Sequence, residues 1–307
     1  MNILKKTRNR LINTREQHRL RNLSKPSFRT KLAERKRIAE RVRKLRGVGD
    51  VPIYSLETKV GHKAIAEKAG IRTSRILQGP VDTLSDFDLE ALPEKFVIKP
   101  IVGSGANGIF FLQKKDTNLL NIFTGEIYPL NLTALYSTAL DRFKETPFIA
   151  EELLELEGRP SINWKAFSFY GEVALLRQID EVGFYGKRAT VGPDKRYKMW
   201  SPEGRELGKI EGHDARYDST LPPATNIGAI VDAANKISKS MMTPFVRVDL
   251  YETDRGVYFG EATLRPGSLW KKKASSLFIP EWDKKLGIMW EEAEARLIDD
   301  IDETYLP

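Results

Sequence analysis

Two stretches of the sequence place charged side chains where they could handle phosphate groups. In the first, a β-branched strand that begins at Phe96 ends in Lys99 and leads into a glycine-rich loop. The loop contains Gly103, Ser104, Gly105 and Gly108. A lysine charge beside a loop of free backbone N–H groups suits the phosphates of a nucleotide. No Lys-Ser or Lys-Thr follows the glycines, which excludes a Walker loop. An ordinary hairpin with a glycine turn is the alternative.

The second stretch runs from Phe245 to Ser268 and reads as a β-hairpin. Strand alternation puts Arg247 and Asp249 on one face, and pairing through the hairpin brings Glu261 beside Asp249. Two adjacent buried carboxylates repel, so they need an arginine or a metal ion to neutralise them. Magnesium fits, because it prefers hard oxygen ligands and bridges to phosphates. The alternative is an acidic pair neutralised by Arg247 without metal.

Composition narrows the chemistry. The chain has no cysteine, which excludes disulfides, thiolate nucleophiles and Cys-based metal sites. Its three histidines, His18, His62 and His213, lack metal-ligand spacing, and we expect all three at the surface. No apolar stretch approaches the roughly 20 residues that span a bilayer, and the N-terminus lacks the apolar core of a signal peptide. We therefore expect a cytoplasmic protein.

The net charge of +8 belongs to an N-terminal arm. Residues 1–46 contain 17 Lys and Arg against 3 Glu, which is +14 and leaves −6 for the rest. Within the arm, Leu32, Ile38, Val42 and Leu45 approach one helical stripe. Such a basic helix can pack on its own domain, lie on the anionic inner membrane surface, or bind an acidic polysaccharide. Nucleic acid is disfavoured, because the arm has a single aromatic residue for base stacking.

The charged residues need a mixed α+β framework to position them. The patterns predict helices over 58–69, 128–143 and 222–241 and a final acidic helix, with strands over 71–77, 96–100 and 109–112. A further strand covers 148–154, and hairpins cover 163–176 and 245–263.

The segment from Thr58 to Ile71, followed by the run from Leu92 to Gly105, resembles the ATP-grasp superfamily and, more narrowly, its TupA-like branch. That branch is associated with teichuronopeptide and other cell-surface polymer biosynthesis. Family members have one lysine at the start of the helix and a second on the strand before the glycine loop. Lys59 and Lys99 stand at those places.

The resemblance extends to other candidate site residues. It implies that Glu151 or Glu152, with the backbone of Leu154, borders the adenine, unless these residues form an exposed edge strand. Lys165 is retained, whereas Asn163 stands where the branch has an aspartate near the ribose.

The remaining implied residues concern the reacting phosphate. A mobile loop would bring Lys187 or Arg188 over it, although a solvent-exposed basic turn fits these residues equally. Asp249 and Glu261 would hold magnesium, and Arg247 would contact the transferred group. Arg265 would approach the acceptor. Thr263 replaces a ligand asparagine of the wider superfamily, as it does in the branch.

The resemblance implies an ATP-grasp fold, with two α+β lobes of antiparallel sheet that enclose ATP behind a basic helical arm. The expected divisions are 1–50 for the arm, 51–150 for the N-lobe and 151–307 for the C-lobe. The implied function is a carboxylate–amine ligase that uses ATP and Mg²⁺, forms an acyl phosphate, and attaches an amino acid or amine to a cell-surface polysaccharide or its precursor. A kinase of the same fold and a non-catalytic nucleotide-binding subunit are the alternatives.

Overall fold

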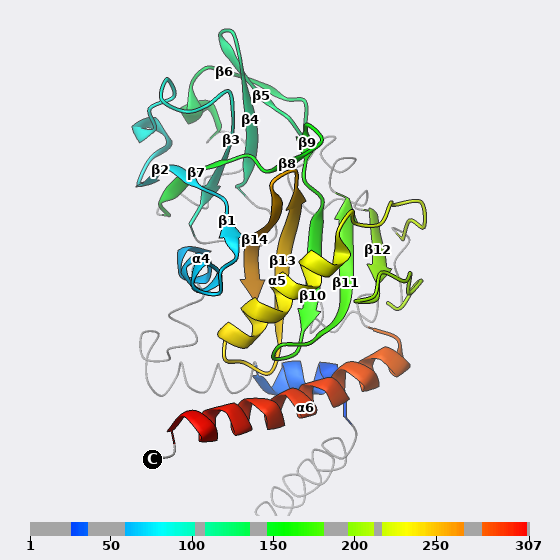
Figure 1. Cartoon of the computed structure of the whole chain (residues 1–307). Coiled ribbons are helices and arrows are strands. Elements are labelled where there is room, and N and C mark those ends of the chain that lie inside the picture. The colour runs from blue at the N-terminus through cyan, green and yellow to red at the C-terminus, as the bar shows by residue number, and fades with distance from the viewer. Residues whose placement is uncertain are drawn as a thin grey trace, which may run out of the picture.

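The computed structural model describes most of the chain, and within it the protein is built from two sheets flanked by helices (Figure 1). The described residues are 26–35, 59–101, 108–135, 146–180, 196–211, 217–266 and 278–305. Neighbouring strands in both large sheets are antiparallel, apart from one short parallel pair at the edge of the second. The predicted α+β class with antiparallel sheets is confirmed.

The first sheet has the strand order β2-β7-β3-β4-β5-β6. Its strands are β2 (Ile76–Val81), β3 (Lys95–Pro100), β4 (Phe110–Lys115), β5 (Asn118–Asn121), β6 (Ile127–Pro129) and β7 (Phe148–Glu152). The predicted pairing of the strands on either side of the glycine loop is confirmed, because β3 pairs with β4. Strand β7 lies inside the sheet between β2 and β3, so the alternative of an exposed edge strand there is excluded.

The second sheet has the strand order β1-β14-β13-β10-β11-β12. Its strands are β1 (Arg72–Thr73), β10 (Asn163–Ser168), β11 (Val173–Asp180), β12 (Arg196–Trp200), β13 (Val246–Thr253) and β14 (Gly256–Thr263). Both predicted hairpins are present, as β10–β11 and β13–β14. A small ribbon of β8 (Glu155–Leu156) and β9 (Arg159–Pro160) follows the first sheet.

Helices cover both faces of the second sheet (Figure 1). α5 (Ile227–Ser240) packs its apolar side on one face, in a core that also includes Trp164 and Val248. α6 (Pro280–Tyr305) packs on the other face, together with a short helix over residues 28–35. α4 (Lys59–Lys68) lies against β14, and short 3-10 helices occupy Leu84–Asp86 and Leu132–Leu135.

The described part of the basic arm belongs to the core under the second sheet. Phe28 is 1% exposed, and its ring meets Phe245 edge-on with centroids 4.8 Å apart. Leu32, one turn later, is also buried. The backbone of Arg29 donates to the Asp283 carboxylate at 2.9 Å. Over residues 26–35 the arm therefore packs on its own domain, one of the three expected arrangements, while its residues 1–25 and 36–50 lie outside the described part.

The predicted strand over 71–77 is wrong in one respect, because the chain changes sheets inside it. β1 pairs with β14 in the second sheet, whereas β2 pairs with β7 in the first. Ser74, between them, is buried and donates its hydroxyl to Glu151. This side-chain bond fixes the crossing point, which no local pattern reveals.

Two other expectations need correction. The helix predicted over 128–143 does not begin at Tyr128: Tyr128 lies in β6, the chain turns at Asn131, and only Leu132–Leu135 form a short 3-10 helix, while residues 136–143 lie outside the described part. His62 is not at the surface but is 5% exposed on the inner side of α4, where burial lowers the pKa of its imidazole. The helix after Pro222 begins only at Ile227, because Asn226 caps it.

We expect Gly287→Ala to destabilise the protein. A Cβ at Gly287 would lie 2.3 Å from the Ser27 backbone nitrogen and 2.6 Å from the Pro26 carbonyl carbon. The free energy of unfolding should fall by about 1–3 kcal/mol, because the segment must move off α6. Gly228→Ala in α5 is the matched control: its nearest contact is 3.7 Å, and it should stabilise by roughly 0.5–1 kcal/mol. Equal denaturation midpoints for the two variants would contradict this packing.

Candidate functional site

One buried cluster joins α4 to the first sheet. Glu151 on β7 accepts from Lys99 on β3 at 2.6 Å through one carboxylate oxygen and contacts Lys63 on α4 at 2.5 Å through the other. Ser74 also donates to Glu151, at 2.9 Å. Lys99 reaches Glu151 diagonally, because Val97 is the direct cross-strand partner of Glu151 and Lys99 lies two residues further on the same face.

The charges of this cluster are almost completely removed from water. Glu151 is 3% exposed and Lys63 is 5% exposed. Burial by itself raises the pKa of the Glu151 carboxyl, but the charges of Lys99 and Lys63 outweigh it and hold that pKa below its usual value. Burial lowers the pKa of Lys63, against the opposing effect of Glu151. One carboxylate thus keeps two ammonium groups together in the interior.

Lys63 is a site residue that the sequence reading missed. It lies four residues after Lys59, so the two fall on one face of α4. That spacing was the available signal. Lys59 is the first residue of α4, and its side chain lies outside the described part of the structure.

A second cluster forms a straight row of charged residues across the second sheet. Cross-strand register aligns Glu261 on β14, Asp249 on β13, Lys165 on β10 and Arg177 on β11. Two anions therefore lie beside two cations on one face. The predicted pairing of Asp249 with Glu261 is confirmed by this register.

A β-bulge at Gly260 creates the alignment of the two carboxylates. The register shifts between Asp249 and Leu250, so Leu250 pairs with Phe259 while Asp249 pairs with Glu261. The extra residue, Gly260, is the only type that fits: a Cβ there would lie 2.5 Å from the Tyr251 ring. Without the bulge, Glu261 would fall on the face that α5 covers.

Asp249 is held from two sides. Arg247 donates Nε to Oδ1 at 2.7 Å and Nη2 to Oδ2 at 2.9 Å, and Lys165 Nζ also contacts Oδ2. Burial raises the pKa of the Asp249 carboxyl, but the nearby charges of Arg247 and Lys165 bring it below its usual value. Arg247 Nη2 also donates to Glu261 at 3.2 Å and to the Thr263 hydroxyl at 2.9 Å.

The donor set of this row fits a magnesium ion bound together with phosphates. Magnesium commonly takes one or two protein carboxylates and completes its shell with waters and phosphate oxygens. Asp249 and Glu261 supply carboxylate oxygens from paired strands, and the Glu261 side chain is 39% exposed. The described residues contain no group of three or more acidic or histidine side chains that could hold a metal ion. The protein ligands available in this row are therefore two carboxylates.

Three residues that the resemblance sets beside the nucleotide, Glu152, Leu154 and Asn163, have contacts within the protein. Glu152 accepts from the Arg75 backbone at 2.9 Å and from Arg255 at 2.9 Å. The Leu154 carbonyl accepts from the Ser161 N–H at 3.1 Å. Asn163 is buried, and its amide donates to the Tyr251 hydroxyl at 3.4 Å, while its Oδ1 has no hydrogen-bond partner among the described residues.

Several expected site residues cannot be placed. Gly103, Ser104, Gly105, Lys187 and Arg188 lie outside the described residues. Gly108, with φ +75°, ends the glycine loop just before β4. Arg265 follows the end of β14 and is half-buried.

Arg177 and Glu211 form a further pair that the sequence reading missed. Glu211 is buried and makes an ion pair with Arg177, whose guanidinium lies 5.1 Å from the centre of the Tyr197 ring. Arg177 extends the charged row, whereas Glu211 comes from a distant loop segment. Alternation in the β10–β11 hairpin could have placed Arg177 on this face, but no local signal indicates Glu211.

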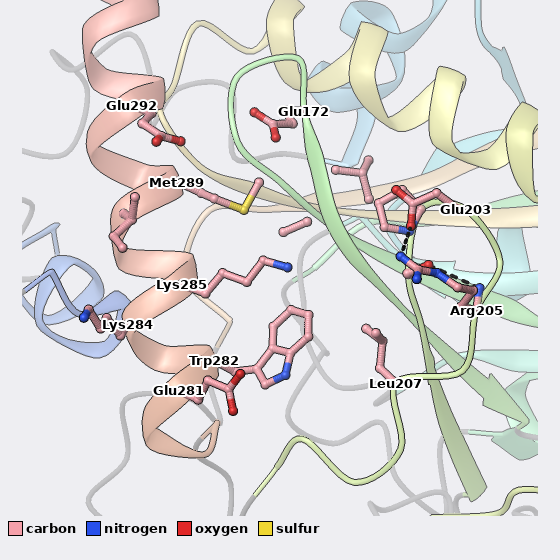
Figure 2. A pocket seen from close by; sticks show the side chains of 15 residues that line it. Glu172, Glu203, Arg205, Leu207, Glu281, Trp282, Lys284, Lys285, Met289 and Glu292 are labelled. Atoms are coloured by element: carbon pink, nitrogen blue, oxygen red, sulfur yellow. Dashed lines mark hydrogen bonds and ion pairs between the residues drawn. The ribbon is translucent and has the colours of Figure 1, made fainter.

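A separate cleft of about 530 Å³ lies between α6, the β10–β11 turn and the segment after β12 (Figure 2). Figure 2 shows Trp282 and Lys285 on the α6 side and the ion-paired Glu203 and Arg205 opposite. None of its lining residues belongs to the two charged clusters. The cleft is therefore distinct from the candidate site.

We expect Glu151→Gln to lower the free energy of unfolding at pH 7 by about 3–5 kcal/mol, because Lys63 would keep a buried charge without its carboxylate. Since the folded pKa of Glu151 is depressed, its contribution is present above the usual value of 4.5 and is lost as the pH falls through the lower folded value. The stability gap between wild type and variant should therefore narrow below about pH 4.5.

Urea denaturation from pH 3 to 7 measures this gap. Lys63→Met is the comparison variant: it leaves Glu151 paired with Lys99 and should cost less than Glu151→Gln. A gap that stays constant down to pH 3 would contradict a depressed carboxyl pKa.

Comparisons with known proteins identify the family of the chain. The family model described as TupA-like ATPgrasp matches residues 37–289. A search of the curated proteins gave no match.

Similar solved structures include D-alanine–D-alanine ligase from Bacillus anthracis complexed with ATP, at 16% identity, TM-score 0.47, and coverage of 83% of this chain and 68% of that one. VanG D-Ala:D-Ser ligase from Enterococcus faecalis has 18% identity, TM-score 0.47, and coverage of 80% and 62%. The ATP-grasp ligase PsnB complexed with its minimal precursor has 14% identity, TM-score 0.40, and coverage of 79% and 62%. The present chain thus spans less than two thirds of the latter two proteins. Because the family model covers most of the sequence, the chain belongs to the TupA-like ATP-grasp family.

Proposed function

We propose that the protein is an ATP-dependent carboxylate–amine ligase. The γ-phosphoryl group of ATP passes to a substrate carboxylate and gives an acyl phosphate with release of ADP. An amine then attacks the acyl carbon, phosphate leaves, and an amide forms. Such a reaction needs charge stabilisation and alignment rather than a covalent nucleophile, which suits a chain without cysteine.

The observation that carries this proposal is the charged row of Lys165, Asp249 and Glu261 with Arg247 beside it. Each of these side chains contacts at least one oppositely charged partner, so the row is close to neutral before any ligand arrives. Phosphate groups and their counterion can exchange with these internal partners at little cost in net buried charge.

The roles of individual residues in this proposal are those that the family resemblance implies. Lys99 and Lys59 bind the α and β phosphates, and the loop from Gly103 to Gly108 covers them. Glu151, Glu152 and the backbone of Leu154 border the nucleotide, with Lys165 nearby. Arg247 contacts the transferred phosphoryl group, Lys187 closes over it, and Arg265 approaches the acceptor.

Asp249 and Glu261 would hold Mg²⁺, which supplies charge neutralisation at the phosphates when bound. Within the chain, Arg247 and Lys165 keep the Asp249 carboxylate ionised and oriented toward the same face as Glu261. The hairpin thereby presents both carboxylates in fixed register.

For the substrate, we propose that an amino acid or amine is joined to an acidic cell-surface polysaccharide or its precursor. The support is the family membership, together with the excess of positive charge in residues 1–25, which contain eight Lys and Arg against one Glu. A basic segment holds a polyanion or the anionic inner membrane surface by long-range attraction. No helix among the described residues has the length and apolar character to cross a membrane.

Hydroxylamine trapping tests the chemistry. The protein is incubated with MgATP, hydroxylamine and a pool of amino acids, uronates and uronate oligosaccharides, and hydroxamates are identified by mass spectrometry. A hydroxamate together with ADP is the expected result and names the activated acid. A phosphorylated alcohol without any hydroxamate would identify a kinase instead.

Glu261→Gln should reduce hydroxamate formation by at least about 100-fold, because a carboxylate at the reacting phosphates is lost. The fold should survive, since the Glu261 side chain is partly exposed and Arg247, its ion-pair partner among the described residues, keeps Asp249. Glu172→Gln is the matched control: Glu172 also pairs with one arginine, at 3.3 Å, and is similarly exposed. Full activity in Glu261→Gln would refute the metal assignment.

Removal of residues 1–25 should weaken binding to polygalacturonate while leaving the melting temperature and the affinity for MgADP unchanged. The truncation must stop before Pro26, because Phe28 and Leu32 belong to the core. Binding is measured at two salt concentrations, since electrostatic attraction weakens with ionic strength. Unchanged polygalacturonate affinity would exclude this segment as a polyanion contact.

A further inference from the structure

The side chain of Arg35 donates hydrogen bonds to the backbone at the open end of the β13–β14 hairpin. Its Nη1 donates to the Phe245 carbonyl at 2.8 Å and to the Leu264 carbonyl at 3.0 Å. Phe245 immediately precedes β13 and Leu264 immediately follows β14. One guanidinium thus ties together the two chain ends of the hairpin that carries the candidate metal ligands.

Other contacts hold Arg35 in this place. Its Nη2 donates to the Thr243 hydroxyl at 2.7 Å, and its guanidinium lies 4.5 Å from the centre of the Trp290 ring. Trp290 in turn stacks on Phe245 with centroids 5.3 Å apart. The same helical segment inserts Phe28 against Phe245. Side-chain packing and hydrogen bonding therefore converge on one residue at the base of β13.

Position in the chain makes this contact informative. The family match begins at residue 37, so Arg35 and Phe28 lie outside the matched residues. Arg247 is two residues from Phe245, and Thr263 is adjacent to Leu264. If the Phe245 or Leu264 carbonyl moved, the neighbouring backbone would move with it. The guanidinium of Arg247 would then be displaced from its hydrogen bonds with Asp249, Glu261 and Thr263.

We infer that Arg35 is a positioning residue for the catalytic hairpin and that residues 26–35 are part of the working site rather than a detachable arm. The guanidinium is needed for its fork of donors, which reach two carbonyls and a hydroxyl together; a lysine ammonium cannot reproduce that planar arrangement. The expected effect of Arg35 on nucleotide binding rests on the proposed function. The expected effect of Arg35 on the hairpin backbone does not.

The first test is amide hydrogen exchange of the full chain and of the variants Arg35→Met, Arg35→Lys and Arg29→Met. Arg29 lies on the same segment with an exposed side chain and serves as the control. Exchange in peptides that cover β13 and β14 should quicken about tenfold or more in both Arg35 variants, with β3 and β4 unchanged. Equal acceleration in both sheets, or no acceleration, would overturn the inference.

The second test is calorimetric binding of ADP with and without Mg²⁺, well below the melting temperature. In wild type, Mg²⁺ should raise the affinity for ADP. In both Arg35 variants the ratio of ADP affinities with and without Mg²⁺ should be about tenfold smaller than in wild type, while in Arg29→Met it should be unchanged. If Mg²⁺ raised the ADP affinity of the Arg35 variants as much as that of wild type, Arg35 would have only a structural role. The positioning role would then be overturned, and the proposed function would stand. If wild type itself binds no MgADP, the proposed function fails, and the consequence at the nucleotide fails with it.

Discussion

Asp249 is a carboxylate buried between Arg247 and Lys165, and much of the second sheet is arranged to tolerate that charge. Removing an anion from water costs several kcal/mol, and here two cations with direct hydrogen bonds offset the cost. Glu151 repeats the arrangement in the first sheet with Lys63 and Lys99. Each cluster is an anion shared by two cations. A polyphosphate would offer the cations of each cluster new anionic partners, and a metal ion would do the same for the carboxylate, so binding would exchange partners rather than bury new uncompensated charge.

The strand register explains why these charges meet on one face while the other face stays apolar. The hairpin holds one register from its turn up to Leu250, and the bulge at Gly260 then shifts it by one residue. This shift places Glu261 and Thr263 with Arg247, and it turns Ala262 toward α5. A single extra residue therefore decides which side of β14 carries chemistry. The constraint on Gly260 is local sterics, since the Tyr251 ring occupies the space of a side chain.

Much of the hairpin could be predicted from the sequence, because alternation and a short turn determine which residues face each other. Regular pairing from the turn would set Asp249 opposite Gly260, so the exact pairing of Asp249 with Glu261 depends on the bulge at Gly260, which the alternation alone does not indicate. Lys63, Glu211 and Arg35 were not found, because their partners are far away in the chain and depend on how helices and loops dock. The crossing at Ser74 was missed for a similar reason: a strand that changes sheets has no separate local pattern. The helix expected from Tyr128 failed because Pro129 and Asn131 favour a strand end and a turn.

The two ends of the β13–β14 hairpin are held by different parts of the chain. At the turn, Arg255 bonds Glu152 and the Asp254 carboxylate accepts from the Glu157 N–H, which ties the hairpin to the end of β7 and to the β8 region. At the open end, Arg35 bonds both flanking carbonyls. Between these anchors the backbone has little freedom to slide, so the charged row keeps its register even when a ligand draws Arg247 or Lys165 away. A hairpin held at one end only could shift by a residue along β10, and Asp249 would then lose its alignment with Lys165.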